Sequence, residues 1–201
     1  MPNIKQILHA ISDLPDQVYT PKDDSYLFVD VLSDLPLRDK EVLDIGTGSG
    51  ILGLFCAQKE ARVTVTDIDD VTLENVSITA SKLGLNVKMT KSNLFSNVVG
   101  QFDVVLFNPP YLPSENIKDS TIDGGAEGRT FIDRFFNGLA THLKQDGFAL
   151  LLISSLNDPH SIIVNHSNYS ISVAARRTLF FEELQVLLCR FRDLAGQRLD
   201  S

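Results

Sequence analysis

The chain has 201 residues, of which 43% are hydrophobic and 22% are charged, and its formal net charge is −8. This length and composition are typical of one globular domain with a sizeable core. The acidic balance argues against broad binding to nucleic acid, which depends on Lys and Arg, and no apolar stretch is long enough to span a bilayer.

The predicted elements begin with a helical segment and continue with alternating strands and helices. Apolar residues at helical spacing predict a short helix in residues 4–14, and Thr20, Pro21 and Asp23 match a capping box that opens a second helix. Gly84 is placed to end the helix expected at 70–83. Strands are expected at 41–46, 62–68, 86–91, 103–107, 147–154, 170–178 and 184–192, and further helices at 49–60, 70–83, 128–143 and 158–166.

This alternation predicts an α/β fold in which strands joined through helices form a parallel sheet with helices on both faces. The last two strands have no helix between them, so we expect them to pair as an antiparallel hairpin. No linker, repeat or low-complexity tract divides the chain. We therefore expect a single domain over residues 1–201, with residues 1–37 as a helical extension and residues 38–201 as the catalytic core.

The cysteine and histidine positions argue against disulfides and metal binding. Cys56 and Cys189 both lie in apolar runs, so we expect buried free thiols in a reducing compartment. The chain has no CxxC motif and its four histidines are scattered, so no metal site is predicted. The first residues lack the apolar region of a signal peptide, and we expect a cytoplasmic protein.

A glycine loop follows the first predicted strand, with Gly46, Gly48 and Gly50 directly before a helix. Glycines let the backbone turn sharply and approach a ligand at the helix N-terminus. Dinucleotide enzymes also use such a loop, but their fingerprint needs Gly or Ala where this chain has Ile51. Asp44 precedes the glycines, and its carboxylate suits the amino group of an amino-acid-bearing ligand better than a pyrophosphate.

Polar residues also follow the second and third predicted strands. Asp67 lies about 20 residues after the loop, where a carboxylate binds ribose hydroxyls, and Ile68 is placed to cover an adenine face. The alternative is that the acidic residues here only cap the next helix, a role that we assign to Asp69. Asn93 and Leu94 follow the third strand where adenine is expected, although a simple turn asparagine fits Asn93 nearly as well.

The fourth predicted strand runs into Asn108-Pro109-Pro110-Tyr111. The nitrogen of an amide or aromatic NH2 group is a poor nucleophile because its lone pair is delocalised. The Asn108 side-chain oxygen and the Pro109 carbonyl can each accept one N–H, which would orient that nitrogen for methyl transfer. Tyr111 offers an aromatic wall for a planar substrate and a cationic donor. The competing interpretation of this tetrapeptide is a surface turn.

Together these segments resemble HemK-type class I methyltransferases, and within them the short branch that methylates the glutamine of the GGQ motif in class 1 release factors. The segments that carry the resemblance are residues 18–25, 43–50, 66–68, 107–111 and 124–136. The resemblance gives Ser25 a cofactor contact and makes the 1–37 extension part of the cofactor site. Thr20 departs from the family, which usually has Glu there, and Asn93 stands where Asp is common.

The resemblance implies a Rossmann-like fold with a seven-stranded, mostly parallel sheet, an antiparallel last strand and helices on both faces. The implied cofactor is S-adenosyl-L-methionine, with S-adenosyl-L-homocysteine as product. The implied catalytic residues are Asn108, Pro109 and Tyr111. The implied cofactor contacts are Ser25, Asp44, Gly46, Gly48, Gly50, Asp67, Ile68, Asn93, Leu94 and Asn108.

The resemblance also implies partners: a class 1 release factor as substrate and a small zinc-binding activator protein. In the family the strands are ordered 3-2-1-4-5-7-6, which places residues 86–91 at a sheet edge. An edge strand can be extended by another chain, so we expect a heterodimer through this edge. The alternative is that a neighbouring helix covers the apolar face of this strand and its lysines guard the edge.

Other functions stay open on the sequence alone. An Asn-Pro-Pro-Tyr methyltransferase can also act on adenine N6 in RNA or DNA, or on a protein lysine. A base-flipping enzyme needs further contacts to its nucleic acid, and no basic face is apparent, so we expect no direct nucleic-acid binding. A cofactor-binding scaffold subunit without activity is the non-enzymatic alternative.

Overall fold

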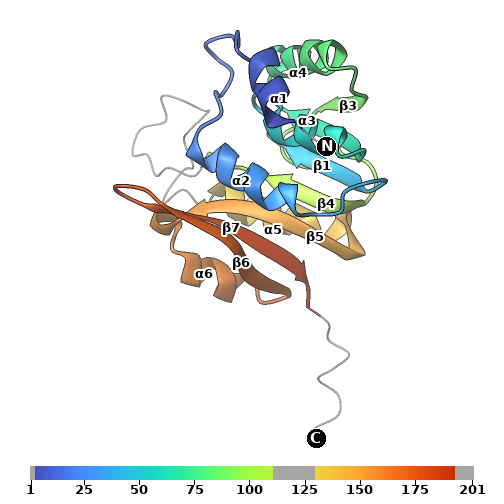
Figure 1. Cartoon of the computed structure of the whole chain (residues 1–201). Helices are drawn as coiled ribbons and strands as arrows, with labels where there is room; N and C mark the ends of the chain where they lie inside the picture. The colour runs from blue at the N-terminus through green and yellow to red at the C-terminus, as the bar shows by residue number, and fades with distance from the viewer. Residues whose placement is uncertain (1–2, 111–129, 193–201) are drawn as a thin grey trace, which may run out of the picture.

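Seven strands form one sheet in the order β3-β2-β1-β4-β5-β7-β6. The computed structural model describes residues 3–110 and 130–192. The strands are β1 Glu41–Ile45, β2 Arg62–Asp67, β3 Val87–Lys91, β4 Phe102–Phe107, β5 Leu143–Ser154, β6 Tyr169–Thr178 and β7 Glu183–Phe191. The first five pair in parallel, and β7 is antiparallel to both of its neighbours. The predicted fold class is confirmed, including the edge position of β3 (Figure 1).

Helices pack on both faces of this sheet. They are α1 Ile4–Ala10, α2 Asp23–Ser33, α3 Ile51–Gln58, α4 Asp70–Lys82, α5 Thr130–His142 and α6 Pro159–Asn165. Alternate strand residues point to opposite faces, so β4 sends Val104 and Leu106 into one core and Val105 and Phe107 into the other. The first core is closed by helices α1 to α4, and the second by α5 and α6. No helix among the described residues is long and apolar enough to cross a membrane.

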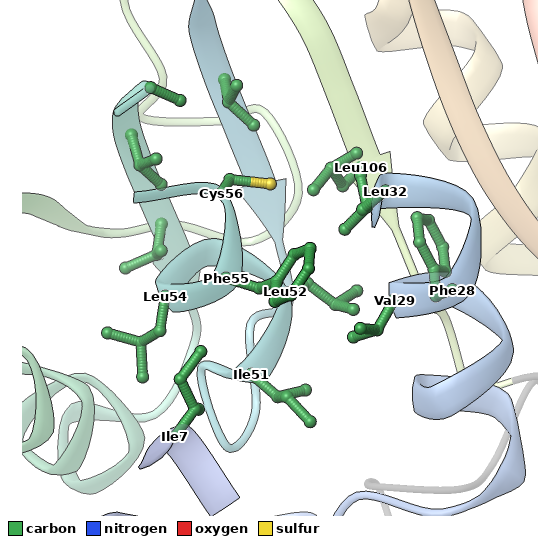
Figure 2. Packing of buried hydrophobic residues seen from close by; sticks show 14 of the residues in the cluster. Ile7, Phe28, Val29, Leu32, Ile51, Leu52, Leu54, Phe55, Cys56 and Leu106 are labelled. Atoms are coloured by element: carbon green, nitrogen blue, oxygen red, sulfur yellow. The ribbon is translucent and has the colours of Figure 1, made fainter. Parts of the chain in front are cut away.

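The N-terminal helices belong to the first core. Figure 2 shows Phe28, Val29 and Leu32 of α2 facing Leu52 of α3, with Leu106 of β4 close by. Because α2 is packed in this way, its first turn lies beside Asn108, which follows the carboxyl end of β4. The cysteines Cys56 and Cys189 are buried free thiols, one in each core, as predicted.

The predicted start of α2 is wrong. The helix begins at Asp23, after an N-cap at Lys22 whose side chain makes no capping hydrogen bond. The capping box with Thr20 fails because the helix starts later than predicted, which puts Asp23 at the first helical position instead of the third. The Asp23 side chain is paired across the chain instead, with its Oδ1 3.2 Å from Arg177 Nη1 of β6. Other boundaries shift by a few residues, and β5 begins at Leu143, four residues early, because Leu143 pairs with Phe102 before a register shift.

Candidate active site at the carboxyl edge of the sheet

The glycine loop connects β1 to α3 through left-handed backbone. Gly46, Gly48 and Gly50 have φ angles of 60°, 52° and 80°, a region that residues with side chains rarely adopt. Gly50 also has no room for a side chain, since a Cβ there would lie 2.8 Å from Val76 Cγ2 of α4. A Cβ at Gly48 would lie 3.4 Å from that of Tyr19, so the N-terminal segment lies directly beside the loop.

Asp44 is 1% exposed at the end of β1 and supports the loop from beneath. Its Oδ2 accepts hydrogen bonds from Thr47 Oγ1 at 2.6 Å and from the Gly53 amide at 3.0 Å. Burial raises the pKa of Asp44 to about 7, because the two hydrogen bonds offset only part of the desolvation and the charge of Asp67 adds to it. A buried carboxylate with this pKa is stabilised in its charged form by a nearby cation.

Gly53 is a site residue that the sequence reasoning missed. A Cβ there would lie 2.5 Å from Val65 Cγ1 and 3.1 Å from Asp44 Oδ2. Only glycine therefore lets α3 approach β2 closely enough for its backbone amide to reach Asp44. The signal in the sequence was a glycine inside an otherwise apolar helix, which costs helix stability unless packing requires it.

Asp67 ties the second strand to the glycine loop. Its Oδ2 accepts from the Gly48 amide at 3.2 Å and its Oδ1 from the Asp69 amide at 3.1 Å. Burial is the largest cause of the raised pKa of Asp67. Asp69 caps α4 through the Val71 amide, as predicted. Ile68 is 57% exposed beside the carboxylate, so its apolar side chain is open to a ligand.

Asn93 and Leu94 follow β3 at the same edge of the sheet. Leu94 is buried with a φ of 52°, whereas Asn93 is exposed. Arg134 of α5 donates to the Asn93 side-chain oxygen at 2.9 Å. This arginine was not predicted as a neighbour, because the contact spans 41 residues of sequence. A carboxamide oxygen has two lone pairs, so Asn93 keeps one acceptor position for a ligand amine.

Asn108 follows β4, and its carboxamide is held from one side. Its Nδ2 donates to Asp24 Oδ2 at 2.9 Å, while its Oδ1 is buried without a hydrogen-bond partner among the described residues. The next residue, Pro109, is buried as well. Tyr111 lies outside the described residues. Among the described residues, the Asn108 Oδ1 atom is therefore an unpaired acceptor, a state that is costly unless a donor arrives.

Asp24, the partner of Asn108, was missed by the sequence reasoning. It is 2% exposed in the first turn of α2, and its Oδ2 also accepts from Tyr19 Oη at 2.8 Å. Its Oδ1 accepts from the amide of Ser25 at 2.7 Å and from Ser25 Oγ at 3.3 Å. Ser25 is itself 2% exposed. The segment 19–25 thus connects the glycine loop, through Tyr19, to Asn108, through Asp24.

Comparison with known proteins identifies the class of enzyme that carries this site. A family model described as the methyltransferase small domain matches residues 22–180. The chain belongs to this family. A Methanocaldococcus jannaschii protein, provisionally named a protein N5-glutamine methyltransferase, is 39% identical over 183 residues, covering 87% of this chain and 92% of that protein. The Koribacter versatilis release factor glutamine methyltransferase is 30% identical, covering 77% of this chain and 62% of that protein.

A solved structure agrees with both relatives. A chain of the E. cuniculi Mtq2-Trm112 complex, which is responsible for methylation of the termination factor eRF1, superposes with a TM-score of 0.73. It is 27% identical, and the match covers 88% of this methyltransferase and 99% of that chain. The predicted resemblance to HemK-type methyltransferases and the prediction of an enzyme are confirmed.

Proposed function

We propose that this methyltransferase transfers a methyl group from S-adenosylmethionine to the side-chain amide nitrogen of a glutamine, in the GGQ motif of a class 1 release factor. The observation that carries the proposal is the unpaired, buried Oδ1 of Asn108 beside Pro109. Support for the substrate comes from two relatives named as glutamine methyltransferases and from the structural neighbour that acts on eRF1.

The residues around the glycine loop fit the methyl donor. Asp44 is a buried carboxylate whose raised pKa calls for a cation, and the donor's amino group supplies one. Asp67 would accept hydrogen bonds from the ribose hydroxyls, and Ser25 lies buried in the segment beside the loop. Ile68, Asn93 and Leu94 would surround the adenine. When bound, the donor supplies an electrophilic methyl group on a sulfonium.

The residues that contact the substrate, Asn108 and Pro109, then need only to orient a weak nucleophile. Asn108 Oδ1 and the Pro109 carbonyl each accept one N–H of the glutamine amide, which reduces delocalisation of the nitrogen lone pair and directs it outward. The nitrogen–carbon bond forms as the carbon–sulfur bond breaks, and one N–H proton then leaves to water. Since that proton becomes acidic once nitrogen carries the methyl group, no strong base is required.

The test is transfer of a labelled methyl group from S-adenosylmethionine. We expect label in a class 1 release factor and none in its GGQ→GGA variant, with mass spectrometry locating the methyl on the glutamine. RNA, DNA and histone are assayed in parallel, because adenine also presents a planar NH2 and lysine an amine. Label in one of these acceptors, with none in the release factor, would replace the proposed substrate.

We also propose that a small activator protein, zinc-binding in the family that this chain resembles, pairs with β3 in a 1:1 heterodimer. The structural neighbour is a two-protein complex, and β3 lies at the sheet edge. Val87 is 8% exposed and Met89 packs against the first core, so the apolar face of β3 is covered by the chain itself. What β3 offers a partner is therefore its backbone edge.

The backbone of β3 allows a sharp test of this pairing. The Ser92 amide donates to the Asp67 carbonyl of β2, and amides along a strand alternate in direction. The backbone amide of Thr90 therefore points toward β2, whereas the backbone amide of Met89 points outward from the sheet edge. We expect Met89→Pro to weaken the complex more than the fold, and the matched Thr90→Pro to destabilise the fold itself. A protein that is monomeric and fully active without a partner contradicts the heterodimer and leaves the methyltransferase unaffected.

A further inference from the structure

The side-chain amide of Asn108 has two possible orientations, and only one of them serves the proposed reaction. With the oxygen toward the substrate, the Asn108 amide accepts a hydrogen bond from an N–H of the substrate nitrogen that is to be methylated. With the NH2 group toward the substrate, two donors face each other and the acceptor nitrogen is repelled. The shape of an asparagine is nearly the same in both orientations, so its neighbours must decide.

Asp24 is the neighbour that decides. An ionised carboxylate only accepts hydrogen bonds, so the group of Asn108 that faces it at 2.9 Å is the NH2 group. Asp24 is itself fixed, because Tyr19 and Ser25 donate to its two oxygens. It also lies in the first turn of α2, where the helix N-terminus favours negative charge.

We propose that Asp24 is a positioning residue of this methyltransferase: by holding the Asn108 amide in one orientation, it aims Oδ1 at the acceptor nitrogen. The proposal rests on the proposed function, in which Asn108 accepts an N–H of the substrate. It explains why Nδ2 of Asn108 is paired while its Oδ1 has no partner among the described residues. It also explains why a carboxylate lies 2% exposed in the chain's interior, beside a residue 84 positions away.

The first test is Asp24→Asn, which keeps the shape of the side chain at position 24. The new side chain no longer requires that Asn108 present its NH2 group. The new amide can donate to Asn108 Oδ1, so the Asn108 amide is free to turn. We expect kcat to fall roughly tenfold or more, while donor affinity changes by less than about threefold. The matched control is Asp23→Asn, the same charge change one residue earlier, where the side chain contacts Arg177; kcat should stay near wild type.

A double mutant separates positioning from a general structural role. If Asp24 acts through Asn108, Asp24→Asn added to Asn108→Ala should cause no further loss of kcat. Full additivity of the two losses overturns the inference. Near wild-type turnover of Asp24→Asn, in a protein that needs Asn108, also overturns it and leaves the proposed function intact. Near wild-type turnover of Asn108→Ala removes the proposed activation mechanism itself.

A second measurement needs no folded Asp24 variant. In 15N-labelled wild-type protein, the Asn108 side-chain NH2 signals are assigned by their loss in Asn108→Ala. One proton bonded to a buried carboxylate should be shifted downfield and exchange slowly with water. Signals at ordinary positions that exchange rapidly would show that Asp24 does not hold the amide, and would overturn the inference.

Discussion

Two buried aspartates, Asp44 and Asp24, lie at the same edge of the sheet and differ in how their charge is compensated. Asp44 accepts two hydrogen bonds, from Thr47 and Gly53, and burial raises its pKa to about 7. Asp24 accepts four hydrogen bonds, one of them from Asn108. Within the described residues, protein donors reach only the Oδ2 atom of Asp44, which leaves this carboxylate open to a cationic ligand. Both oxygens of Asp24, by contrast, accept hydrogen bonds from protein groups.

The difference separates binding from positioning. A carboxylate whose charge is incompletely compensated gains free energy when a cation binds, so we assign Asp44 to the donor half of the proposed site. A carboxylate with donors from three positions of the chain gains little from a ligand and instead fixes its neighbours. The comparison predicts that substitutions on the Asn108 side affect turnover, and that substitutions on the glycine-loop side affect donor affinity.

The largest expected effect is that of Asn108→Ala. It removes the acceptor for the substrate N–H, and kcat should fall roughly 10²-fold or more, as for other single groups aimed at the reacting atom. Donor affinity, measured by calorimetry, should change far less, because in the proposed reaction Oδ1 contacts the substrate nitrogen and not the donor. A variant that loses donor binding and turnover in parallel would erase the distinction between the two halves.

The next effect is that of Asp67→Ala on the other half. Leaving ribose hydroxyls unpaired, and releasing the Gly48 amide, should weaken donor binding by roughly 1–3 kcal/mol. The matched control is Asp70→Ala, three positions after Asp67, which removes an exposed carboxylate paired with Lys91 and should leave donor affinity unchanged. A folded Asp67→Ala protein with wild-type donor affinity would remove Asp67 from the donor site.

The two aspartates also show what sequence can predict. The partners of Asp44 lie within nine residues of it, so the strand, the loop and the helix start were visible as a local pattern. The same holds for Asp69, which caps α4, and for Gly84, which ends it with a φ of 65°. These features depend on backbone geometry over a few residues, and the sequence predicts them correctly.

Contacts across the chain were not predictable in this way. Asp24 bonds to a residue 84 positions later, Arg134 bonds to Asn93 over 41 positions, and Arg177 bonds to Asp23 over 154. The last of these engages the acid that was expected to complete a capping box. Only the order of strands and the packing of α2 bring such residues together, and neither follows from local pattern.

The smallest expected effect is a pH dependence of donor binding, which we assign to Asp44. The pKa of Asp44 is raised to about 7 in the free protein, and a bound ammonium group must lower it. Binding then releases a proton near neutral pH. Donor affinity should decrease as the pH falls through 7, by roughly tenfold per unit at most, and should flatten as the pH rises above 7.

Calorimetry from pH 6 to pH 7.5, in two buffers with different ionisation enthalpies, measures both the affinity and the proton released. The range stops below pH 8, near which the donor's own amino group loses its proton. Asp67 also has a raised pKa, so the isosteric Asp44→Asn variant is needed to separate the two. That variant should bind weakly, release fewer protons and lose most of the pH dependence. If donor affinity in Asp44→Asn changes with pH as steeply as in the wild type, the titrating group is not Asp44. The contrast with Asp24 must then rest on geometry alone.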